Sequence, residues 1–168
     1  MNQDQKLKWI KRLTWFFIIG LFLSGATAIP LKTELDVAAK LLGGTDLVHE
    51  AASTGLTHWI LKVREALRNT YFLYPFMAYG TDWLAFGHFV IALAFVGPLR
   101  DPVRNRWLYQ FGLIACVLVI PYAMILGAAR GILFYWRLID CSFGVFGFIP
   151  LWFCWRWTGE LEKAPIKP

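Results

Sequence analysis

Five ionisable residues lie inside or beside long apolar stretches of this 168-residue sequence. Asp82, His88 and Asp140 fall within such stretches, whereas Arg130 and Arg137 lie in the polar link between the last two. Arginine side chains bind anions, and neighbouring aspartates can hold them in place. Histidine exchanges protons near neutral pH. The five residues therefore predict a ligand-binding site, because charge in an apolar medium is costly unless it has a function or a partner.

Each of these residues also has a purely structural interpretation. Asp82 and Asp140 stand where two apolar helices are expected to begin, so both could cap free N–H groups and meet the helix dipole. Arg137 precedes Asp140 by three positions and could pair with it along one helix. A neutral His88 could hydrogen-bond to a neighbouring helix. The sequence leaves the structural and the functional interpretations open.

Metal or cofactor binding has little support in the sequence. His49, His58 and His88 match no spacing of a known metal motif, and no Cys-x-x-Cys pair is present. We expect neither a metal nor a cofactor. The three cysteines are expected to pack as small apolar residues between helices. They are Cys116, Cys141 and Cys154.

The elements that must position these residues are membrane helices. Hydrophobic residues make up 58% of the chain and the mean hydropathy is +0.51, whereas soluble domains are about 45–50% apolar. The excess is gathered into runs of about 20 residues, which is the length that crosses a bilayer as a helix. The sequence predicts one all-α membrane domain over residues 1–168, built as a four-helix transmembrane bundle. The predicted spans are about 9–29, 80–99, 107–127 and 138–157.

The first apolar run has a competing interpretation. Basic residues, an apolar stretch and the sequence Ala26-Thr27-Ala28 together resemble a signal peptide with its cleavage site. The apolar stretch is long and carries Trp15, Phe16 and Phe17, which favours a retained helix. Cleavage near residue 28 stays the alternative.

Residues 30–70 form the longest polar segment of the chain. Leu56, Ile60, Val63 and Leu67 recur at helical spacing, with basic residues elsewhere on the helix. This pattern predicts an amphipathic, extracytoplasmic helical segment between the first two spans. Such a helix could lie among lipid headgroups or cap the bundle.

The distribution of lysine and arginine predicts the orientation. With a cytoplasmic N-terminus, ten basic residues fall on the cytoplasmic side and seven on the outer side. The short loop at residues 100–106 carries three of the ten, and short loops report orientation best. Tryptophans stand near both ends of the predicted spans, as in the aromatic belts of membrane proteins. We expect a multi-pass protein of the cell (inner) membrane with both termini cytoplasmic.

Small residues recur along one face of each of the last two spans, a pattern that lets membrane helices approach closely. It predicts that Asp140, which shares such a face, points towards protein. The third span contributes Gly112, Cys116, Val119 and Ala123, and the fourth contributes Asp140, Gly144, Gly147 and Leu151.

These observations favour a non-catalytic membrane protein, either an accessory or interaction subunit or a binder of a small or lipid-like ligand at the outer face. The expected partners are the lipid bilayer and other membrane subunits or a second copy. Nucleic acid is not expected, because the basic residues flank the spans. The alternative is a membrane-embedded enzyme or small transporter that uses Asp82, His88, Arg130 and Asp140.

Overall fold

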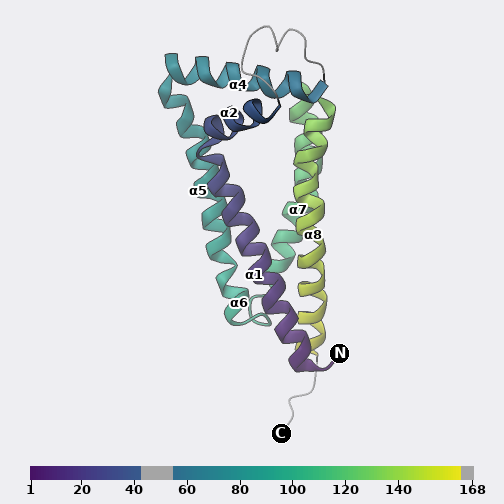
Figure 1. Ribbon diagram of the computed structural model, residues 1–168. Helices are drawn as coiled ribbons and strands as arrows, with labels where there is room; N and C mark the ends of the chain where they lie inside the picture. The colour runs from purple at the N-terminus through teal and green to yellow at the C-terminus, as the bar shows by residue number, and fades with distance from the viewer. Residues whose placement is uncertain (43–54, 164–168) are drawn as a thin grey trace. The chain divides into compact units, whose positions relative to one another are not determined.

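Helices account for all the regular secondary structure in residues 1–42 and 55–163, which are the residues that the computed structural model describes (Figure 1). The chain divides into two units, which we describe separately. The first unit contains residues 1–21 and 90–168, and the second contains residues 22–89. The elements are α1 (Gln3–Ala28), α2 (Leu31–Leu41), α4 (Gly55–Leu73), η1 (Pro75–Ala78), α5 (Tyr79–Ala94), α6 (Val96–Arg100), α7 (Arg106–Ala129) and α8 (Phe134–Glu162).

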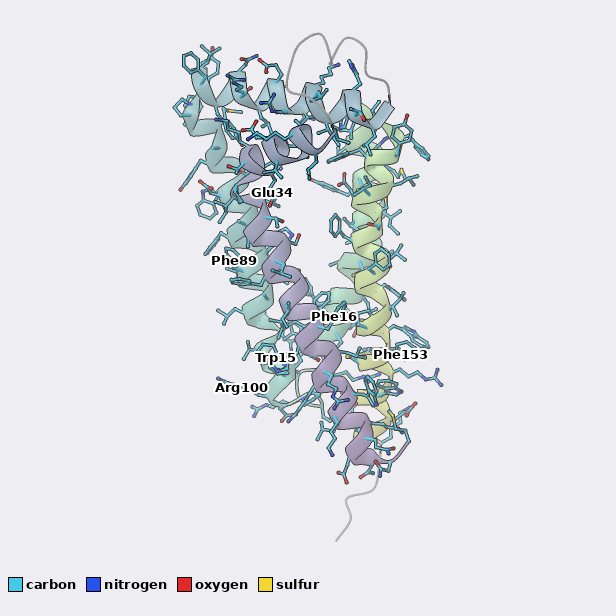
Figure 2. The ribbon with its side chains drawn as sticks, in the orientation of Figure 1. Trp15, Phe16, Glu34, Phe89, Arg100 and Phe153 are labelled. Atoms are coloured by element: carbon cyan, nitrogen blue, oxygen red, sulfur yellow. The ribbon has the colours of Figure 1, made fainter. Side chains whose placement is uncertain are left out.

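Four helical stretches are long and apolar enough to cross a membrane. These stretches are Gln3–Ala28, Pro75–Arg100, Arg106–Ala129 and Phe134–Glu162. Their presence confirms the predicted all-α membrane fold. Large apolar side chains such as Phe16 of α1, which is 66% exposed, project from these helices (Figure 2). Exposed aromatic and aliphatic side chains are expected where lipid replaces water.

The fourth span is longer at both ends than the sequence predicted. It runs from Phe134 to Glu162 rather than over about 138–157. Its 29 residues extend about 43 Å at the α-helical rise, beyond the roughly 30 Å of a bilayer's hydrocarbon core. Hydropathy marks where apolar composition ends, whereas backbone hydrogen bonding continues into the flanking polar and aromatic residues.

In the first unit, α7 and α8 lie side by side and antiparallel (Figure 1). Their backbones approach closely at Gly144, where an added methyl group would lie 2.5 Å from the carbonyl oxygen of Cys116. One turn further, a methyl group at Gly147 would lie 3.0 Å from the Cys116 sulfur. Gly112 leaves similar room for Leu151. These contacts confirm the predicted packing of the two small-residue faces.

The link between α7 and α8 is only four residues long and turns at Gly131, whose φ is +71°. The N–H of Ile132 donates to the carbonyl of Gly127 at 2.8 Å, and the N–H of Gly131 donates to that of Ala128 at 3.1 Å. These two bonds form a Schellman motif, which satisfies carbonyls left free at the end of a helix. Glycine suits the left-handed conformation because it has no Cβ.

The first unit also has a buried core to which α1 contributes. Ile10, Thr14 and Ile18 lie on one face of α1 and are buried. Phe17 packs its ring against Phe95, with the ring centroids 4.7 Å apart. The rest of the core comes from α5, α7 and α8 and the residue that follows α5, and its main members are Ala92, Phe95, Tyr109, Leu151 and Cys154.

The second unit pairs two amphipathic helices. Leu35 and Ala39 of α2 and Leu61 of α4 are buried, and α2 packs against α4. An ion pair of 2.5 Å joins Arg64 of α4 to Asp36 of α2. The predicted helical segment between the first two spans is therefore present as a helical hairpin in its described part, residues 31–42 and 55–73.

The end of α1 and the middle of the second span also meet within the second unit. A methyl group at Gly25 would lie 2.9 Å from both His88 and Phe89. Phe22 and Phe89 stack at 5.0 Å between ring centroids (Figure 2 labels Phe89). Gly25 thus allows α1 and α5 to approach closely at this point.

The contact at Gly144 gives a direct test of the α7–α8 packing. Gly144→Ala should lower the free energy of unfolding in detergent by about 1–3 kcal/mol, because the methyl group would meet backbone that cannot move aside. Gly20→Ala is the matched control, since a methyl group there has no described atom within 4 Å. Thermal unfolding of both variants is the measurement. Equal stability of the two variants would contradict the close approach.

Candidate functional site

The five predicted site residues are divided between the two units. Arg130, Arg137 and Asp140 belong to the first unit, whereas Asp82 and His88 belong to the second. The gathering of all five at one end of the molecule stays a prediction.

Arg137 supports the end of α7. Its Nη1 donates to the carbonyl oxygen of Met124 at 3.3 Å. Its guanidinium lies over the ring of Phe134 at 5.4 Å, and its aliphatic stem lies on Gly127, where an added methyl group would meet it at 2.6 Å. A cation near the C-terminal end of a helix meets the negative end of the dipole. Arg137 therefore stabilises the α7–α8 hairpin.

Asp140 is partly buried within α8, and within residues 1–42 and 55–163 it forms no hydrogen bond or ion pair. The expected local pair with Arg137 is not formed, because the Arg137 side chain turns towards α7. The capping interpretation of Asp140 is also wrong. Since α8 begins at Phe134, Asp140 lies six residues inside the helix, where the backbone N–H groups are already bonded.

The two residues that remain near helix ends behave differently. Asp82 is exposed and lies in the first turn of α5, where its charge meets the positive end of the dipole. Arg130 is exposed and is the C-cap residue of α7, where a cation is favoured. Helix-end electrostatics accounts for both without a ligand.

His88 is bonded to its own helix. Its Nδ1 lies 2.8 Å from the carbonyl oxygen of Leu84, one turn earlier in α5. A carbonyl only accepts hydrogen bonds, so Nδ1 carries the proton and donates it, and Nε2 takes no part in this bond. The sequence suggested a bond to another helix, but the side chain completes its hydrogen bond locally.

A buried polar cluster joins three helices of the first unit, and the sequence analysis missed it. Tyr109 of α7 donates its hydroxyl to Thr14 of α1 at 2.7 Å, and Thr14 donates to the Ile10 carbonyl at 2.8 Å. The thiol of Cys154 in α8 lies 3.7 Å from the same carbonyl. Thr14, Tyr109 and Cys154 are all fully buried. Neutral hydroxyls and thiols lower hydropathy little, so only the helical register could have suggested this cluster.

Ion pairs connect the same three helices near the ends of the chain. Lys6 of α1 pairs with Glu160 of α8 at 2.6 Å, and Arg106 of α7 pairs with Glu162 of α8 at 3.1 Å. The Arg106 guanidinium also lies over the ring of Trp155, 4.8 Å from its centroid, and Nε donates to the Trp155 carbonyl. Gly159 leaves room for this guanidinium. Exposed ion pairs contribute little singly, but this group fixes which helix ends lie together.

Metal ligation has no candidate among the residues that the structure places: no three His, Cys, Asp or Glu side chains gather there. His49 lies outside the described residues. Cys141 and Cys154 are buried and Cys116 is partly buried, and all three carry free thiols.

Comparison of this chain with protein-family models, with curated proteins and with solved structures gives no match.

The buried cluster predicts a non-additive pair of substitutions. Thr14→Val keeps the shape but leaves the Tyr109 hydroxyl buried without its acceptor, which should cost about 1–3 kcal/mol of stability. Tyr109→Phe removes the hydroxyl itself and should cost about 0.5–1.5 kcal/mol. The double variant should therefore be more stable than Thr14→Val alone. Thermal unfolding in detergent measures all three.

Thr27→Val is the control for this cycle, because Thr27 of α1 is exposed and donates to the carbonyl of Ser24 within its own helix. It should unfold with the parent protein. Strict additivity of the Thr14 and Tyr109 substitutions would show that their hydroxyls do not interact.

Proposed function

We propose that this protein is a non-catalytic, multi-pass protein of the cell membrane that binds a partner through Asp140. The partner supplies a cationic or hydrogen-donating group. A basic side chain on another membrane helix has this chemistry, whether the helix belongs to a different subunit or to a second copy, and so does the amine of a small or lipid-like ligand. The observation that carries the proposal is a partly buried carboxylate within a span that has no partner in the described residues.

The cost of leaving Asp140 unpaired supports this proposal. An aspartate at the centre of a membrane helix costs about 2.5–3.5 kcal/mol for insertion, and less towards the interface. Asp140 lies six residues after the start of α8, about 9 Å along its axis, which places it near the edge of the hydrocarbon core. The nearest cation along the helix, Arg137, is already bound to α7. A group from outside the chain would remove the cost.

The proposed orientation has both termini in the cytoplasm, which puts the α7–α8 turn and Asp140 near the outer face. The basic residues support it, because Arg100 at the end of α6 and Arg104 in the link before α7 are both exposed. A retained first helix is part of the same proposal. It is supported by the complete burial of Ile10 and Thr14 of α1 in the core of the first unit.

Removing the charge of Asp140 should separate assembly from stability. Asp140→Asn should raise the unfolding free energy of the isolated chain by about 1–2 kcal/mol, because an unpaired charge is removed from a span. The same variant should lose its bound partner, seen by native mass spectrometry after extraction from membranes in a mild detergent. Asp82→Asn is the control, since Asp82 is exposed and is expected to affect neither measurement strongly.

Two outcomes would contradict the partner proposal. Lower stability of Asp140→Asn would mean that the carboxylate is used inside the chain. An unchanged mass spectrum would mean that no partner depends on the charge.

Orientation can be measured with reporter fusions. Fusions after residue 8 and at the C-terminus should report a cytoplasmic location, and fusions near Gly44 and Ala129 should report an external one. N-terminal sequencing of the purified protein should show that its first residue lies before Thr14, so that the first helix is retained. A mature protein that begins near Ile29 would show that the first run is a cleaved signal, and an external C-terminus would remove one span.

A further inference from the structure

The second unit contains a sharp corner where α4 gives way to a membrane span. α4 ends at Leu73, and Tyr74 breaks the helix with φ −136° and ψ 70°. The span that follows begins at Pro75. Figure 1 shows α4 running across the direction of α5. Since transmembrane helices tilt by about 20° from the membrane normal on average, a helix that runs across α5 is directed along the membrane surface.

The corner exposes aromatic and flexible apolar side chains to its surroundings. Phe72 is 86% exposed and Phe76 is 70% exposed. Tyr79 and Trp83 pack edge to face, 5.9 Å between ring centroids, and both remain more than half exposed. Phenol and indole rings favour the boundary between headgroups and acyl chains. We call this set the aromatic corner, and it consists of Phe72, Tyr74, Phe76, Met77, Tyr79 and Trp83.

The hairpin of α2 and α4 beside the corner is positively charged on its exposed surface. The ion pair between Arg64 and Asp36 neutralises one base and one acid internally. Of the remaining charges in the described part of the hairpin, the acids are Glu34 and Glu65. Four bases remain exposed, namely Lys32, Lys40, Lys62 and Arg68. An anionic surface is therefore electrostatically complementary to the hairpin.

We propose that the α2–α4 hairpin binds anionic phospholipid headgroups of the leaflet from which the second span begins. The aromatic corner fixes the depth of α4 at the interface, and the exposed bases select negative headgroups. Binding to such a surface combines burial of apolar area with electrostatic attraction; here the aromatic corner supplies the apolar area and the exposed bases supply the attraction. Continuity with the span at Pro75 holds the C-terminal end of α4 at the bilayer surface, which makes that surface the occupant. This inference is independent of Asp140 and its partner.

The experiment uses the full chain in lipid nanodiscs and follows hydrogen–deuterium exchange of the α4 backbone. One disc contains phosphatidylcholine alone, and the other contains about 30% phosphatidylglycerol, an anionic lipid. Exchange in α4 should be at least about threefold slower in the anionic disc. Salt at about 1 M should abolish the difference, because it shortens the Debye length to about 3 Å.

Two double variants identify the residues responsible. Lys62→Gln with Arg68→Gln removes two exposed bases of α4 and should abolish the lipid-dependent slowing. Arg100→Gln with Arg104→Gln removes two exposed bases of the first unit and should retain it. Equal exchange of the parent protein in the two discs would overturn the proposal without any variant. Slowing that survives in the Lys62 and Arg68 variant would overturn the assignment to this hairpin.

Discussion

The close approach of α8 to α7 at Gly144 is the contact on which the packing of this hairpin depends. Apolar side chains are not driven out of lipid by the hydrophobic effect. Helices in a membrane are therefore stabilised against one another by close packing and by hydrogen bonds between them. A glycine opposite the Cys116 carbonyl provides this closeness in the middle of the hairpin. Glycines towards its two ends serve another purpose, since Gly127 receives the stem of Arg137 and Gly159 receives the guanidinium of Arg106.

The same arrangement explains why Asp140 has no partner among residues 1–42 and 55–163. Arg137 lies one turn before Asp140 on α8, but the short turn at Gly131 brings the end of α7 within its reach. The arginine gains a carbonyl acceptor and an aromatic face there. Because Arg137 bonds to α7, it does not pair with the Asp140 carboxylate, and the proposed function is based on this carboxylate.

Sequence patterns predicted much of this fold for a clear physical reason. A bilayer requires about 20 apolar residues per helix, and close packing requires small residues at helical spacing, so both leave periodic marks in the chain. The start of α8 was predicted too late because Arg137 was assigned to the polar link between the last two spans. The error made Asp140 look like a helix cap. The Thr14–Tyr109–Cys154 cluster left no mark, because each residue is unremarkable in its own segment and only three-dimensional proximity unites them.

The cluster of Thr14, Tyr109 and Cys154 determines how late during synthesis α1 can complete its buried contacts. The hydroxyl of Thr14 bonds to Tyr109, which is synthesised 95 residues later, and the carbonyl of Ile10 accepts from Cys154, which is synthesised 144 residues later. At ribosomal rates of about 5–20 residues per second, the delay is on the order of ten seconds. The α7–α8 hairpin, by contrast, needs only neighbouring segments. Thr14 can satisfy its hydroxyl through the Ile10 carbonyl during that interval, so the nascent first helix can remain in lipid until the rest of its core arrives.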